Sequence, residues 1–325
     1  MKFRIRGMSR AQMLFLIIVT MLYLLPLFKV PILVLHIMIY TLLLAYAATS
    51  WNLLGGFAGQ LSLAHGAFLG IGAYLAALLF MNSNISPWIT LPLAIIAGAG
   101  VAMVIGYPCF RFGLRGAYFA IASLVFNLIL VEILIAWREV TGGSLGLSIR
   151  RINDPLYFQF ATKEPYYWIM LTMWIIAILL IKKAKKLRYY LAAIRESEEA
   201  AAALGIPVRR YKLVAAIISG ALTASAGVFY AQYFMYVNPE GTAGVEMSVE
   251  LLLIALFGGK FTILGPTIGA AIIVPLSEYL RYTLGGVYAG LHRVIFSIIL
   301  IVLVLFLPQG IWGKIDEKWS LEVKL

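Results

Sequence analysis

The chain has 325 residues, of which 62% are hydrophobic and 12% charged, and its mean hydropathy is +0.94. These values exclude a soluble or disordered protein, and the single cysteine, Cys109, excludes a scaffold held by intrachain disulfides. The net charge of +12 comes from basic residues that lie between apolar runs, so it indicates membrane topology and not a nucleic-acid partner. Three histidines and one thiol predict no metal site.

Long apolar runs that contain Gly and Pro predict an all-α polytopic membrane protein with about ten transmembrane helices in a single transmembrane domain, residues 1–325. The first run, residues 11–28, follows four basic residues and is expected to be a retained span, since no cleavage site follows it. The others, in chain order, are residues 31–51, 61–81, 87–107, 117–137, 166–181, 213–236, 247–258, 262–282 and 287–307. Most reach the roughly 20 residues that cross a bilayer, but residues 247–258 are too short and are expected to form a half-helix.

The Lys and Arg residues predict which loops are cytoplasmic, because basic loops are retained inside during insertion. Nine basic residues lie in residues 182–212, which we therefore place inside; residues 138–165 form the outer loop. Ten spans then place both termini in the cytoplasm. The alternative is that the eighth and ninth runs merge, which gives nine spans and an outside C-terminus.

Residues 188–204 predict a cytoplasmic helix, because they are rich in Ala, Leu, Glu and Arg and are followed by Gly205 and Pro207. Its expected apolar face consists of Leu187, Leu191, Ile194, Ala201 and Leu204. Such a face could lie on membrane lipid, attracted by the basic flank, or bind another protein. The composition alone leaves both interpretations open.

The spacing of Glu199, Ala200, Ala201 and Gly205 resembles the EAA loop of ATP-binding cassette (ABC) importer permeases. After Gly205 the chain lacks the Leu-Pro element of the wider consensus, and residues 193–213 instead resemble the version found in LivM-type permeases of branched-chain amino acid importers. Residues 55–63, 115–120, 141–143 and 308–313 extend the resemblance in the same order. It covers roughly residues 42–313.

This resemblance implies a transport subunit and not an enzyme: the transmembrane permease subunit of an ABC importer for branched-chain or other hydrophobic amino acids. It also implies a homologous LivH-like permease subunit, two ATP-binding subunits, an extracytoplasmic solute-binding protein, and a bacterial or archaeal cytoplasmic membrane. ATP would be used by the partners, since this chain has no phosphate-binding loop motif and is expected to bind no cofactor. The residues expected to couple to the ATPase are Arg195, Glu198, Glu199, Ala200, Ala201 and Gly205. A urea or short-amide ABC permease and an ion-coupled secondary transporter remain alternatives.

Polar and glycine residues within the apolar runs are the candidates for the translocation pathway: Gly55, Gly56, Gly59, Gln60, Ser62, His65 and Glu250. Glycines here predict either a broken helix that exposes backbone groups or close helix packing. His65 is expected to be a hydrogen-bonded packing residue, and Glu132 and Glu250 are expected to find local charge partners. Thr141, Gly142 and Gly143 are candidates for an outer-loop contact with a delivery protein, or form an ordinary flexible loop.

Overall fold

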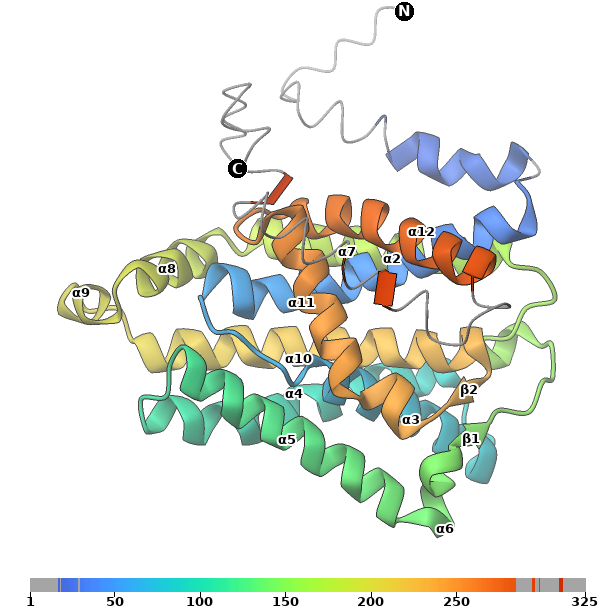
Figure 1. Cartoon of the computed structure of the whole chain (residues 1–325), viewed down its shortest axis with the longest axis horizontal. Coiled ribbons are helices and arrows are strands. Elements are labelled where there is room, and N and C mark those ends of the chain that lie inside the picture. The colour runs from blue at the N-terminus through green and yellow to red at the C-terminus, as the bar shows by residue number, and fades with distance from the viewer. Residues whose placement is uncertain are drawn as a thin grey trace, which may run out of the picture.

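The computed structural model describes residues 17, 19–28, 30–284, 294–295, 298 and 310–311, most of which are helical (Figure 1). The membrane helices are α2 (Ile32–Asn52), α3 (His65–Ser83), α4 (Pro87–Arg111), α5 (Ala117–Ala136), α7 (Glu164–Lys183), α10 (Val208–Phe234), α11 (Val245–Gly259) and α12 (Gly265–Leu284). The shorter elements are η1 (Leu25–Phe28), η2 (Leu53–Phe57), α6 (Arg138–Thr141), η3 (Gly143–Leu145), β1 (Leu147–Ser148), η4 (Pro155–Tyr157), α8 (Lys185–Glu196), α9 (Glu198–Ala203), β2 (Tyr236–Val237) and η5 (Pro239–Ala243).

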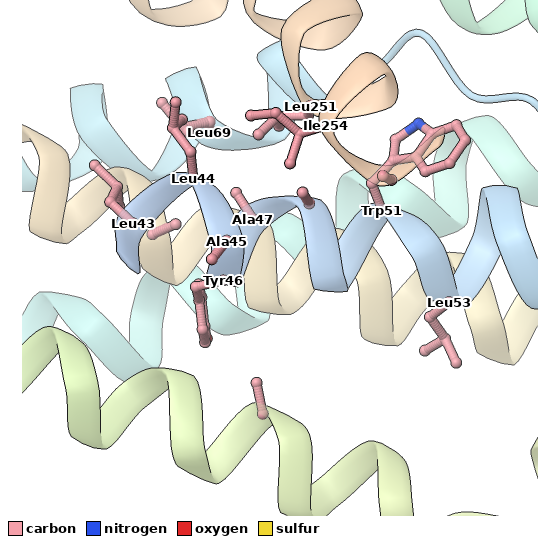
Figure 2. Close-up of a cluster of buried hydrophobic side chains, with 14 of the residues drawn as sticks. Leu43, Leu44, Ala45, Tyr46, Ala47, Trp51, Leu53, Leu69, Leu251 and Ile254 are labelled. Carbon is pink, nitrogen blue, oxygen red and sulfur yellow. The ribbon is translucent and has the colours of Figure 1, made fainter. Parts of the chain in front are cut away.

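The helices form an elongated bundle in which α10 packs against α4, α3 and α2, while α12 packs against α2 and α11 (Figure 1). One end of the bundle carries α8 and α9, and the other carries the antiparallel pair of β1 with β2. We call these the α9 end and the β1 end. A buried apolar cluster joins α2 to α3 and α11 in the interior, where Leu44, Leu69 and Leu251 point toward one another (Figure 2).

Seven helical stretches of the described chain are long and apolar enough to cross a membrane. They correspond to the second to eighth predicted runs, and the ninth run forms α12, a 20-residue helix that is not among the seven. The first run is described only in part, and nearly all of the tenth lies outside the described residues. A multi-pass helical membrane protein is therefore confirmed, while the count of ten remains a prediction.

The eighth run differs from its prediction in length. The apolar helical stretch begins at Pro239 and reaches Gly259, 21 residues in all, but α11 alone has 15 residues, fewer than the roughly 20 that cross a bilayer. The stretch is interrupted, because Gly244 is extended (φ −65°, ψ 166°) between the π-helix η5 and α11. Residues 260–264 separate α11 from α12, so the two do not form one continuous helix, contrary to the nine-span alternative.

Small residues bring the central helices into backbone contact. A Cβ at Gly72 of α3 would overlap the carbonyl oxygen of Ala224 on α10, and one at Gly70 would overlap Ala243 of η5. Close packing of small residues is a general means of joining helices inside a bilayer. These two glycines therefore allow α3 to pack closely between α10 and η5.

The outer loop is ordered by its glycines. Gly142, Gly143 and Gly146 all have positive φ (75°, 62° and 70°), a conformation that glycine adopts without steric cost. The Thr141 hydroxyl donates a hydrogen bond to the Trp137 carbonyl at 2.9 Å, and β1 then pairs with β2. The candidate contact residues 141–143 therefore form a turn of defined geometry at the β1 end.

Candidate functional site

The basic segment between α7 and α10 forms two helices, not the single helix predicted. Ser197 is extended (φ −159°, ψ 116°) and separates α8 from α9, and its Oγ accepts a hydrogen bond from the Ala200 amide at 3.1 Å. Serine in this position satisfies a free amide at the start of the second helix, which is why the chain can turn there. The predicted end is confirmed, since Gly205 follows α9 with φ +81°.

The predicted apolar face is only partly buried. Leu191, Ile194 and Ala201 are buried against the bundle, whereas Leu204, which follows the last residue of α9, is 81% exposed. Leu204 is therefore the member of the predicted apolar face that is exposed to lipid or another protein. Tyr189 is also 66% exposed, so two large apolar side chains of this segment lie on the surface of the described chain.

Glu198 ties α9 to the start of α10. The ammonium group of Lys212 lies 2.7 Å from Glu198 Oε1, and the Lys212 side chain is only 3% exposed. The Gln60 amide lies 3.5 Å from the same carboxylate oxygen, and Lys212 Nζ lies 5.0 Å from the centre of the Phe110 ring. A buried ammonium group requires a charged partner, so Glu198 is needed to stabilise Lys212 where it lies.

Glu199 faces the loop between α4 and α5. Its Oε1 accepts a hydrogen bond from the Arg115 guanidinium at 2.7 Å, in an ion pair that is exposed to solvent. This hydrogen bond lowers the pKa of the Glu199 carboxyl below its ordinary value and raises the pKa of Arg115. The adjacent carboxylates of α9 thus bind two different parts of the membrane domain.

Arg195, at the end of α8, packs between two turns of the chain. Its guanidinium carbon lies 3.9 Å from the centre of the Phe261 ring, in the turn between α11 and α12. Its side chain also lies against Gly59, where a Cβ would approach Arg195 Cγ to 2.8 Å and where φ is +66°. Only glycine combines this conformation with this contact, so Gly59 allows α8 to pack on the connection between η2 and α3.

Two groups of residues that the sequence suggested as separate are thus brought together at the α9 end. Gly59 and Gln60, predicted for the pathway, contact Arg195 and Glu198, predicted for coupling. Beside them, a Cβ at Gly56 would overlap the Lys260 carbonyl oxygen, and one at Gly55 would overlap the Trp51 ring. Gly56 therefore allows the end of this helical stretch to pack closely against the turn after α11.

The chain then re-enters the bundle. Residues 58–64 run from the α9 end toward its middle without forming a helix, and α3 begins at His65, four residues later than predicted (Figure 1). His65 is fully buried, with Nε2 2.7 Å from Ser219 Oγ on α10 and Nδ1 3.2 Å from Ser62 Oγ. It is a hydrogen-bonded packing residue, as expected. The Ser62 carbonyl accepts a hydrogen bond from Trp51 Nε1 at 2.8 Å, which fixes the re-entrant segment to α2.

The amino-terminal ends of α3 and α11 meet inside the bundle. The Gly66 amide donates to Ser248 Oγ at 2.7 Å, and a Cβ at Gly66 would overlap the Gly244 carbonyl. Glu250 lies half a turn further along α11, is partly buried, and makes no hydrogen bond with residues 55–65 in the described structure. Its charged neighbours include Glu278 and Arg281, which pair with each other on α12 at 2.9 Å. Among the described residues, the charged neighbours of Glu250 are therefore on α11 and α12.

Comparison with known proteins identifies the family. Residues 33–306 match the family described as branched-chain amino acid transport system / permease component. The chain belongs to this family. It is 29% identical to the LivM permeases of Salmonella typhimurium and Escherichia coli, over 80% of this chain and 65% of each relative, and 26% identical to a probable LivH of Methanocaldococcus jannaschii over 77% and 82%. The chain thus spans about 65% of the length of those LivM relatives. No solved structure matches it.

The comparisons confirm the family resemblance that the sequence motifs indicated. Three contact residues at the α9 end, however, were not assigned to this site from the sequence. Arg115 and Lys212 lie in stretches that carry the resemblance, residues 115–120 and 193–213, but neither was assigned a contact there, and Phe261 carried no signal. Their partners lie 84, 14 and 66 residues away in the chain, in Glu199, Glu198 and Arg195 respectively, and side-chain periodicity does not reveal such pairings.

Proposed function

We propose that the chain is the transmembrane permease subunit of an ABC importer for branched-chain or other hydrophobic amino acids. The observation that carries the proposal is the α9 end, where one short helix contacts α10, the α4–α5 loop and, through α8, the re-entrant segment. A force applied to α9 would reach three parts of the membrane domain at once. The names of the LivM and LivH relatives support the class of solute.

The proposed partners are two ATP-binding subunits, a LivH-like permease and an extracytoplasmic solute-binding protein. The ATP-binding subunit would dock on α9, where Leu204 and Tyr189 offer exposed apolar contacts beside the Glu199 carboxylate. The binding protein would dock at the β1 end, where Thr141, Gly142 and Gly143 form the ordered turn. In this proposal α9 lies in the cytoplasm of a bacterium or archaeon, and the distribution of basic residues supports cytoplasmic termini. The ATP-binding subunits would supply the energy, with no cofactor on this chain.

In this proposal the pathway borders the re-entrant segment. Closure of the ATP-binding subunits would displace α9, and Arg195 would transmit the displacement to Gly59 and to the α11–α12 turn. The amino-terminal ends of α3 and α11 meet at Gly66 and Ser248, and helix amino termini favour the carboxylate of a zwitterionic solute. Opening there would release the solute toward the α9 end.

Reconstitution in vesicles tests the function. The chain, the LivH-like subunit and the ATP-binding subunits, with binding protein, should take up labelled leucine only with ATP, and omission of any one component should abolish uptake. Uptake by the chain alone, driven by an ion gradient, would refute the ABC assignment in favour of a secondary transporter. ATP-dependent uptake of labelled urea without uptake of labelled leucine would instead support the short-amide alternative.

A further inference from the structure

Helix α5 has one polar face inside the bundle and one exposed face. The buried face packs against α3 and η5 and carries Ser123 and Asn127, both 0% exposed and one helical turn apart. The Ser123 hydroxyl is fully used, since it accepts a hydrogen bond from the Leu63 amide and donates one to the Ala120 carbonyl, both at 2.9 Å. Glu132 lies on the exposed face and forms no ion pair with any described residue, so its expected charge partner is not found there.

Asn127 is buried without any hydrogen bond. In the part of the chain that the structure describes, it is the one side chain whose buried amide nitrogen and buried amide oxygen both lack a partner. An asparagine within a membrane span ordinarily binds across to a neighbouring helix. A buried amide with no partner lowers the free energy of unfolding, because it has given up its hydrogen bonds to water. The side chain therefore does not fasten α5 to its neighbours, and its presence needs another explanation.

The position of Asn127 follows from that of Ser123. Both α3 and α5 run from the α9 end toward the β1 end (Figure 1). Leu63, which Ser123 binds, lies two residues before α3, so the next turn of α5 lies beside the first turns of α3. There, a Cβ at Gly66 would overlap the carbonyl oxygen of Gly244, the residue before α11. Asn127 thus faces the junction where the amino-terminal ends of α3 and α11 meet.

The junction itself favours a negative charge. Neither helix has a side-chain cap of its own, since Ala64 precedes α3 and Gly244 precedes α11. Free amides and the helix dipole at an amino terminus attract a carboxylate. The first turn of α3 carries no acidic residue, and Glu246 in the first turn of α11 is exposed. An amide side chain beside these two ends adds a donor for a carboxylate and an acceptor for an ammonium group.

We propose that Asn127 binds the zwitterionic end of the solute when this junction opens, with Nδ2 donating to the carboxylate and Oδ1 accepting from the ammonium group. The inference rests on the proposed function, which supplies an amino acid as solute, and it adds a solute-binding residue on α5. The amide is unpartnered while the junction is closed and partnered while solute is bound. Solute therefore favours the open arrangement, because a ligand shifts an equilibrium toward the state that it binds better.

Thermal unfolding of the purified chain in detergent tests whether Asn127 stabilises the structure. Asn127→Leu replaces the unpartnered amide with an apolar side chain of similar size, so the unfolding midpoint should rise. Tyr74→Phe is the matched control, because it removes another buried, unpartnered polar atom, on α3 about 12 Å from Gly66 along the helix axis at 1.5 Å per residue. Its midpoint should not fall. A lower midpoint for Asn127→Leu would indicate a structural hydrogen bond and overturn the proposal.

Leucine uptake by the reconstituted importer tests the contact with solute. Asn127→Leu should reduce ATP-dependent uptake at least tenfold, whereas Tyr74→Phe should retain it. Both variants should keep wild-type capture of the ATP-binding subunits and wild-type ATP hydrolysis in the absence of solute. Uptake at the wild-type rate by Asn127→Leu would overturn the inference and leave the proposed function intact. Absence of leucine uptake by the wild-type importer, in contrast, would refute the proposed function itself.

Discussion

The ion pair between Glu198 and Lys212 offers the sharpest test of how α9 is held. Glu198→Ala leaves the Lys212 ammonium group in place with 3% of its side chain exposed. Removing one partner of a buried pair costs about 3–5 kcal/mol, and the lower figure applies here because 22% of the Glu198 side chain is exposed. A loss of about 3 kcal/mol is roughly a 150-fold change in the population that has α9 docked.

The double variant separates pairing from packing. Replacing both partners of a buried pair with apolar groups is often close to neutral, so Glu198→Ala combined with Lys212→Met should recover most of the lost stability. The assay is thermal unfolding of the purified chain in detergent, followed by tryptophan fluorescence, together with capture of the ATP-binding subunit. Glu196→Ala is the matched control, since that glutamate is exposed and, among the residues that the structure describes, forms its ion pair with Arg195. Additive losses in the double variant would refute the reasoning.

Four further changes have defined outcomes. Glu199→Arg places two cations together on α9 and the α4–α5 loop, so capture of the ATP-binding subunit should be lost while membrane insertion is retained. The pKa of the Glu199 carboxyl is lowered in the folded chain, so its ion pair with Arg115 stabilises α9 above the unfolded pKa and is lost as pH falls through the folded pKa. A fluorophore on α9 should report this loss in acid, and Arg115→Ala should abolish the response. Gly205→Val, at φ +81°, should cost about 1–2 kcal/mol by thermal unfolding and abolish uptake. Gly72→Ala should cost about 1–3 kcal/mol, whereas Gly100→Ala, with open space around it, should be neutral in the same assay.

The spans were predictable because a segment that crosses hydrocarbon must be apolar and must satisfy its own backbone hydrogen bonds. Apolar runs bounded by Pro87 or by charged residues predicted α4, α5, α7 and α10 to within five residues at each end. A helix satisfies its own backbone groups, so its existence depends on local sequence alone. The end of α9 was predictable for the same reason, since Gly205 can adopt positive φ without a tertiary contact.

The contacts of α9 were not predictable, because they depend on how distant helices cross. The composition of residues 188–204 favours one continuous helix, yet the chain turns at Ser197 and thereby directs Glu198 to Lys212. An isolated helix would not break there, since Ser197 satisfies only one amide and the extended residue breaks the helical hydrogen-bond pattern. The buried ion pair and the packing of Arg195 on Phe261 stabilise the turn in the folded chain.

Residues 53–65 connect the α9 end of the bundle to its interior, and they combine irregular backbone with fixed ends. The π-helix η2 and the non-helical stretch that follows lack the continuous hydrogen bonds of an α-helix, so their geometry changes at lower cost than that of α2 or α3. At the α9 end, Gly59 and Gln60 contact α8 and α9; in the interior, His65 bonds to Ser219 and Gly66 to Ser248. A displacement of α9 therefore has a short covalent route to the place where the amino termini of α3 and α11 meet, and the deformable part of the chain lies between the proposed docking surface at the α9 end and the interior.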